Sequence, residues 1–194
     1  MQPLIKPWEQ LEKAIKNIEG MKSAKSLDEY DENWTDFLHN LERAWNKLVN
    51  HLSKSPKFQG WSRRGQVENL RRSDSLLAYL INARGAEEHS IENITTREAG
   101  GFGINPAVGN TLHIKSLRTD SHGNVSIESD QPLKITFFSS SIKLLPVLNR
   151  GRKYEVPTSH LGKSLSTNKP IELAEIAVEF YKSYFKEAES HFVK

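Results

Sequence analysis

The sequence predicts an α+β protein with an N-terminal helical bundle, a small antiparallel β section and a C-terminal helix. Three observations predict this class. Apolar residues recur with helical spacing up to about residue 98, short segments after residue 99 alternate apolar and polar residues, and an amphipathic stretch closes the chain. We therefore expect a bundle over residues 1–98, a β section with loops over 99–169, and a helix over 170–194 that packs back on the bundle or the sheet.

Four segments carry the helical pattern of the first half. They cover residues 7–20, 26–52, 66–74 and 75–93. Ser26 or Asp28 can cap the second segment, and Ser73 or Asp74 can cap the fourth, because short polar side chains accept hydrogen bonds from the first free backbone N–H groups of a helix. The second segment has the clearest apolar stripe, and we assign its aromatic residues to the core: Trp34, Phe37 and Trp45.

Five segments after residue 110 have strand character. They cover residues 111–118, 124–129, 133–139, 142–149 and 152–157. The glycine-rich residues 100–110 lack both the GxGxxG spacing and the Walker lysine, so we interpret them as a connector between bundle and sheet. Residues 156–170 read as a loop, and Pro170 suits the first turn of the last helix.

Composition excludes several kinds of protein. The chain has 194 residues and no cysteine, so disulfides, zinc ribbons and thiol catalysis are excluded and a cytoplasmic location is expected. We found no apolar run of the length that spans a bilayer and no signal peptide at the start. No HExxH or comparable histidine pair occurs, so neither a metal nor a cofactor is expected. His39 and His51 fit the polar face of their helix, and His160 lies in a loop that could reach a site.

Positive charge is concentrated between residues 54 and 72. Six basic residues stand there against the single acid Glu68, which gives a local net charge of +5 in a chain whose net charge is +3. The six are Lys54, Lys57, Arg63, Arg64, Arg71 and Arg72. Such a patch attracts phosphates and is a candidate RNA-binding surface. The alternative is a solvated loop and helix face.

The stretch "LINARGAEEHSIE", residues 80–92, places a glycine and several charged residues inside a predicted helix. Arg84 and Glu88 lie about 40° apart on a helix, which suits an ion pair worth a few tenths of a kcal/mol. His89 lies about 140° from Arg84, so two antiparallel copies of the helix could bring both residues to one ligand. Glycine at position 85 lowers helix stability by roughly 1 kcal/mol relative to alanine. A glycine at this position is expected where another helix or a ligand approaches the backbone closely.

Arg84 and His89, with four residues between them, match the R-x4-6-H signature of the HEPN family. Residues 74–89 also resemble the pattern D-x-L-L-x-Y-L-x-x-A-R-N-x-x-E-H of bacterial HEPN-like proteins, and the resemblance covers about residues 1–98. It implies a bundle of four or five helices that forms a homodimer through the motif helix. It also implies a metal-independent endoribonuclease of a toxin–antitoxin or phage-defence system, with an antitoxin protein as a possible partner.

In this chemistry the 2′-hydroxyl of RNA attacks the adjacent phosphate. The resemblance implies that Arg84 binds the phosphate and that His89 transfers protons. It also implies that the basic patch extends the RNA-binding surface. Gly85 stands where active members of the family usually carry Asn or Asp. Glu87 and Glu88 either support the two catalytic residues or repel RNA. The alternatives are therefore a catalytically silent HEPN-like binding module, or a plain α+β domain in which Arg84 and Glu88 form only an ion pair.

Overall fold

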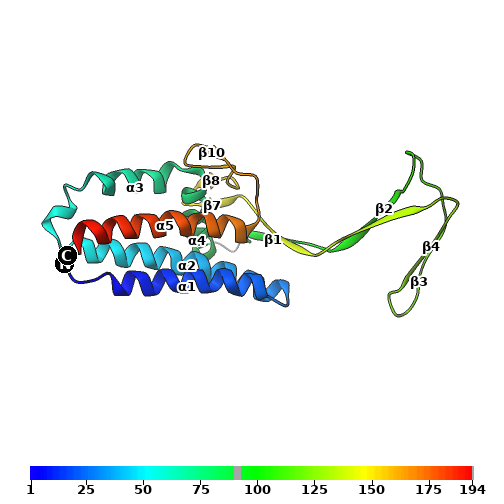
Figure 1. Cartoon of the computed structure of the whole chain (residues 1–194), viewed down its shortest axis with the longest axis horizontal. Coiled ribbons are helices and arrows are strands. Elements are labelled where there is room, and N and C mark those ends of the chain that lie inside the picture. Colours follow the sequence, from blue (N-terminus) through cyan, green and yellow to red (C-terminus); the bar gives the residue numbers. More distant parts are fainter. Residues whose placement is uncertain (90–92, 194) are drawn as a thin grey trace. The chain divides into compact units, whose positions relative to one another are not determined.

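The computed structural model describes residues 1–89 and 93–193, without the side chain of His89 (Figure 1). Its helices are α1 (Ile5–Ser23), α2 (Leu27–Leu52), the 3₁₀ turn η1 (Pro56–Phe58), α3 (Ser62–Ser73), α4 (Ser75–His89) and α5 (Pro170–Phe192). The predicted α+β class, with helices first, antiparallel strand pairs in the middle and a helix last, is confirmed. The apolar pattern of residues 75–93 predicts that Ile91 faces the core, but Ile91 lies outside the described residues. Within those residues, no helix combines the length and the apolar character that a bilayer-spanning segment requires.

The strands pair two by two, and the described residues form no larger sheet. They are β1 (Thr95–Glu98), β2 (Gly101–Pro106), β3 (Ile114–Thr119), β4 (Val125–Ser129), β5 (Leu133–Phe138), β6 (Ser141–Leu144), β7 (Val147–Asn149), β8 (Arg152–Tyr154), β9 (Ser159–His160) and β10 (Lys163–Ser164). The pairs are β1–β6, β2–β5, β3–β4, β7–β8 and β9–β10. The expectation of a plain connector over residues 100–110 is wrong for β2, which pairs with β5 from Gly101 opposite Phe138 to Pro106 opposite Leu133.

The chain divides into two units. The helical unit comprises Met1–Arg97 and Ile142–Lys194, and the ribbon unit comprises Glu98–Ser141. The ribbon unit holds the antiparallel pairs β2–β5 and β3–β4, and none of its residues is buried. The hairpins β7–β8 and β9–β10 belong to the helical unit together with α5, whereas we had expected the β section to extend from residue 99 to 169.

Local signals explain where the helices begin. Ser26, one of the two predicted caps, caps α2 by accepting a hydrogen bond from the backbone N–H of Glu29. Asp74, one of the two predicted caps, accepts a hydrogen bond from the backbone N–H of Leu77 at the start of α4. Pro170 opens α5, where its missing N–H costs no helical hydrogen bond.

The core of the helical unit is rich in aromatic residues. Trp34 and Phe37 are fully buried, and Trp45 of α2 stacks on Tyr184 of α5 with ring centroids 5.6 Å apart. The predicted assignment of the α2 aromatics to the core is therefore confirmed. Helix α4 contacts α2, α3, α5 and the hairpin β7–β8, and it buries most of its first three turns. The candidate motif thus lies at the end of the central helix of the unit.

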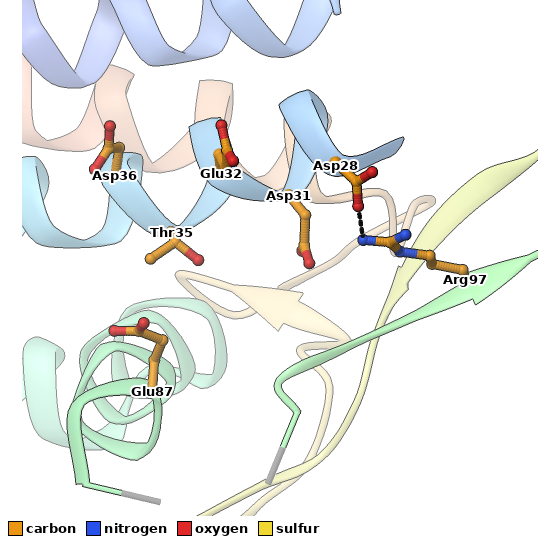
Figure 2. Close-up of a pocket in the computed structure, with 7 residues that line it drawn as sticks. All are labelled: Asp28, Asp31, Glu32, Thr35, Asp36, Glu87 and Arg97. Atoms are coloured by element: carbon orange, nitrogen blue, oxygen red, sulfur yellow. Dashed lines mark hydrogen bonds and ion pairs between the residues drawn. The ribbon is translucent and has the colours of Figure 1, made fainter. Parts of the chain in front are cut away.

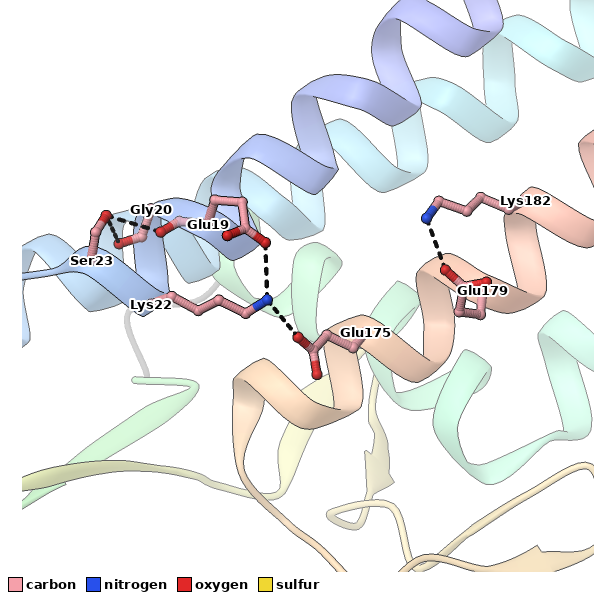
Figure 3. A network of polar contacts seen from close by, with 7 residues as sticks. All are labelled: Glu19, Gly20, Lys22, Ser23, Glu175, Glu179 and Lys182. Carbon is pink, nitrogen blue, oxygen red and sulfur yellow. Dashed lines mark hydrogen bonds and ion pairs between the residues drawn. The ribbon is translucent and has the colours of Figure 1, made fainter.

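Helix α5 packs against α1 and α2 (Figure 1). Figure 3 shows Lys22, near the end of α1, between Glu19 of its own helix and Glu175 of α5, with Nζ 2.8 Å from the Glu175 carboxylate. The hydrogen bonds to Glu175 and Glu19 raise the pKa of Lys22. At the other end of the bundle, the amino group of Met1 donates a hydrogen bond of 2.9 Å to the carbonyl oxygen of Phe192.

Candidate nucleic-acid interface

The last turns of α4 carry the ion pair expected from the spacing of Arg84 and Glu88. The guanidinium of Arg84 donates to the carboxylate of Glu88, and both side chains are about one third exposed, at 33% and 29%. The Nε of Arg84 is buried and has no hydrogen-bond partner among the described residues. The buried Nε cannot reach a ligand in this arrangement, and one terminal nitrogen of Arg84 is committed to an acid of its own helix.

His39 of α2 joins this cluster. Its Nε2 lies 2.8 Å from the carboxylate of Glu87, and its Nδ1 lies 3.5 Å from that of Glu88. Glu87 and Glu88 thus link α4 to α2 through one imidazole. We had placed His39 on a solvated helix face, because nothing in the sequence relates two residues 48 positions apart. The side chain of His89 lies outside the described residues, so its predicted convergence with Arg84 stays a prediction.

Another residue of the chain lies close to the backbone of Gly85, as the energetic cost of a glycine within a helix suggested. A Cβ atom at Gly85 would lie 2.5 Å from Nδ2 of Asn149, which belongs to β7 of the same chain. Asn149 is held there by a hydrogen bond of 2.9 Å from its Nδ2 to Oδ1 of Asn82 on α4. The glycine thus makes room for the hairpin β7–β8 in the protein's own fold.

The variant Gly85→Ala is expected to leave stability nearly unchanged. The better helix propensity of alanine adds about 1 kcal/mol, and displacing the Asn149 amide from Asn82 removes about 1 kcal/mol. In an Asn149→Ala background only the gain remains, so adding Gly85→Ala there should stabilise the protein by about 1 kcal/mol. Urea unfolding of the wild type, the two single variants and the double variant measures the coupling between positions 85 and 149. Strictly additive changes in the free energy of unfolding would contradict the proposed contact.

An acidic cleft of about 480 Å³ adjoins the end of α4. It is lined by Asp28, Asp31, Glu32, Thr35, Asp36, Glu87 and Arg97. Figure 2 shows the carboxylates along the first turns of α2, with Glu87 across the cleft and Arg97 bound to Asp28. No group of three His, Asp or Glu side chains that could hold a metal ion occurs in the described part of the chain. The negative charge beside Arg84 disfavours RNA phosphates at this end of the helix.

The predicted basic patch is divided by tertiary contacts. Arg63 binds Glu187 of α5 with Nε 2.6 Å from the carboxylate, and Arg64 binds Glu68 one turn away at 2.8 Å. Arg71 is only 7% exposed. The remaining members, Lys54, Lys57 and Arg72, are exposed. The count of local charges therefore overstated the surface charge, because acids distant in sequence pack against this segment.

Arg71 lies at the edge of the core. One of its terminal nitrogens lies 2.6 Å from the carboxylate of Glu42, and the other donates to the hydroxyl of Tyr181. Its guanidinium carbon lies 4.2 Å from the ring centroid of Trp45. Burial alone would lower the pKa of Arg71, but Tyr181 and Glu42 outweigh that effect and raise it. The arginine is thus a fixed, permanently charged group.

A second cleft, which we name the arginine cleft, opens beside this residue. Its volume is about 500 Å³, and its lining consists of Trp45, Val49, Glu68, Arg71, Arg72, Ile81, Asn82, Arg152 and Tyr154. The guanidinium of Arg152 lies 5.1 Å from the ring centroid of Tyr154. Three arginines and two aromatic residues from α2, α3 and β8 therefore meet at one concave surface. Cations combined with apolar and aromatic walls are typical of sites that bind nucleotides.

The contribution of the hairpin β7–β8 to this cleft was not predicted from the sequence. Asn149 pairs with Arg152 across a two-residue turn, in which Arg150 has φ of 51° and Gly151 has φ of 75°. Two positive φ values are the geometry of a tight hairpin turn. The basic run of Arg150, Arg152 and Lys153 beside the turn glycine was a signal that could have been used.

No protein-family model, no curated protein and no solved structure matches the chain. The assignment of a function therefore depends on the geometry of the helical unit and on the resemblance of residues 74–89.

Proposed function

We propose that this protein is a HEPN-like RNA-binding protein of the cytoplasm whose helical unit binds RNA at the arginine cleft. The observation that carries the proposal is the meeting of Arg71, Arg72 and Arg152 beside Tyr154 and Trp45. Two of these arginines belong to the basic segment that we expected to contact RNA. Arginine suits this role because its planar guanidinium binds phosphate oxygens in pairs and also stacks on flat rings. This proposal favours the binding module over the nuclease, since acids surround the motif arginine Arg84.

The double variant Arg72→Ala/Arg152→Ala tests the proposal. Both residues are exposed, so their removal should leave the fold intact. We expect RNA affinity to fall by about tenfold for each arginine removed. The dependence of affinity on salt concentration should also become less steep, by about one unit of slope per lost phosphate contact.

Fluorescence anisotropy with a labelled RNA at several salt concentrations measures both effects. The matched control is Arg43→Ala, which removes an exposed arginine of α2 that does not line the cleft. Equal RNA binding by the double variant and by the wild type would refute the arginine cleft as the RNA-binding surface.

A second candidate function is a homodimeric metal-independent endoribonuclease, as the resemblance implies. The partial exposure of the Arg84 side chain favours this candidate. Arg84 would bind the scissile phosphate and His89 would transfer protons, with Glu87 and Glu88 as supporting residues. An antitoxin protein would be the partner if the protein acts in a toxin–antitoxin system.

Cleavage of a mixed RNA pool in EDTA tests this second candidate. A nuclease would leave 2′,3′-cyclic phosphate ends, and both Arg84→Ala and His89→Ala would abolish the cleavage. We expect no cleavage by the wild-type dimer, because the neighbouring carboxylates and Gly85 disfavour catalysis. Cleavage that both substitutions abolish would replace the binding module by the nuclease.

A further inference from the structure

The arginine cleft has two chemically different walls. Apolar surface is supplied by Val49 and Ile81, which are half-buried, and by the ring of Tyr154. Positive charge is supplied at the rim by the exposed Arg72 and Arg152. The acid in the lining is Glu68, and Arg64 neutralises it through the ion pair within α3. The cleft is therefore suited to a ligand that is flat and apolar at one end and anionic at the other.

Arg71 contributes differently from the two rim arginines. Two of its nitrogens are occupied by Glu42 and Tyr181, and its plane is held against Trp45. It cannot reorient to grip a phosphate. Because it is only 7% exposed and lies against Trp45 and Tyr181, it supplies a stationary positive charge rather than a surface for stacking.

Asn82 adds a polar group to the apolar wall. Its Nδ2 donates to the carbonyl oxygen of Ala78, and its Oδ1 accepts from Asn149. These two bonds set the orientation of the amide. One Nδ2 hydrogen and one Oδ1 lone pair remain in addition to these bonds, which is the capacity needed to pair with a base edge.

A double helix presents a different surface. Its phosphates and sugars face outward, and its bases are stacked and paired inside. A double helix can meet the arginines at the rim, but it cannot place a base against Ile81 and Tyr154 without extruding it. The cleft volume of about 500 Å³ lies within the range of roughly 300–1,000 Å³ that is typical of small-ligand pockets.

We propose that the arginine cleft holds one unpaired nucleotide of single-stranded RNA. The base lies against the apolar wall within reach of Asn82, and the phosphate lies between Arg72 and Arg152. This inference rests on the proposed function and adds the class of RNA that the site selects.

The test compares three ligands by fluorescence anisotropy: a short oligouridylate, a duplex RNA of equal length, and UMP as an unlabelled competitor. The single strand should bind the wild type about tenfold more tightly than the duplex, which is the effect of one base-stacking contact. The double variant Ile81→Ala/Tyr154→Ala removes the apolar wall and keeps the arginines. It should reduce binding of the single strand to the level of the duplex and leave duplex binding unchanged. Arg43→Ala is the control, and circular dichroism of each variant verifies its fold.

The failures of the two proposals can be told apart. Equal affinity of the wild type for single strand and duplex would overturn the proposal that the cleft holds an unpaired nucleotide. It would leave the proposal of RNA binding at the cleft intact. The same holds if a folded Ile81→Ala/Tyr154→Ala variant still prefers the single strand. Absence of binding to either RNA would overturn the proposed function itself. Competition by UMP as effective as that by the oligouridylate would overturn both, because the ligand would then be a free nucleotide.

Discussion

The variant Asp74→Ala is expected to lower the free energy of unfolding by about 3–5 kcal/mol, because it removes a cap and two charge-assisted hydrogen bonds at once. The side chain of Asp74 is only 4% exposed. Its Oδ1 accepts from the backbone N–H of Leu77 at 3.0 Å and lies 2.9 Å from Nδ1 of His160, and its Oδ2 accepts from the backbone N–H of Leu161 at 2.7 Å. One carboxylate therefore caps α4 and fastens the hairpin β9–β10 to it.

Urea unfolding followed by circular dichroism measures the effect of Asp74→Ala. The matched control is Asp120→Ala, because Asp120 also accepts hydrogen bonds from two backbone N–H groups, those of His122 and Asn124, but in an exposed turn. Its loss should be much less damaging, since water replaces the carboxylate there. Similar losses of stability in the two variants would contradict the role that we assign to burial.

The variant Glu42→Ala is expected to lower the free energy of unfolding by about 3–5 kcal/mol, because it leaves a buried arginine without its acid. The Arg71 side chain is 7% exposed, and that of Glu42 is 18% exposed. The hydroxyl of Tyr181 remains as a partner for Arg71 but carries no compensating charge, since burial raises the pKa of Tyr181 to about 12. The charge of Arg71 would then be opposed only by water at the mouth of the arginine cleft.

Two further variants show whether the missing charge causes this loss. The double variant Glu42→Leu/Arg71→Met removes both charges and should recover most of the stability lost in Glu42→Ala, because apolar groups of similar volume can replace a buried ion pair. Glu68→Ala breaks the partly exposed pair with Arg64 within α3 and should cost only a few tenths of a kcal/mol. A loss in the double variant as large as in Glu42→Ala would show that side-chain volume, and not charge, governs this site.

Local patterns predicted the helices well. The stripe over residues 26–52 and the cap at Ser26 correspond to α2, and Pro170 marks the start of α5. The strand β2 could not be predicted in the same way, since Gly101 and Gly103 weaken strand propensity and its hydrogen bonds go to β5, about thirty residues later. The two-residue strands β9 and β10 also escaped prediction, because so short a pair has no repeat to detect.

The candidate site also combines features that local sequence patterns predict with features that only distant contacts set. The sequence by itself determined the pair Arg84–Glu88 and limited the cap of α4 to Ser73 or Asp74, because helix geometry brings residues three or four positions apart together. Only the tertiary structure decided that Arg71 is buried beside Glu42 and that Arg152 joins it at the arginine cleft. Such contacts join segments far apart in the chain, and their partners depend on how helices and hairpins pack rather than on any local repeat.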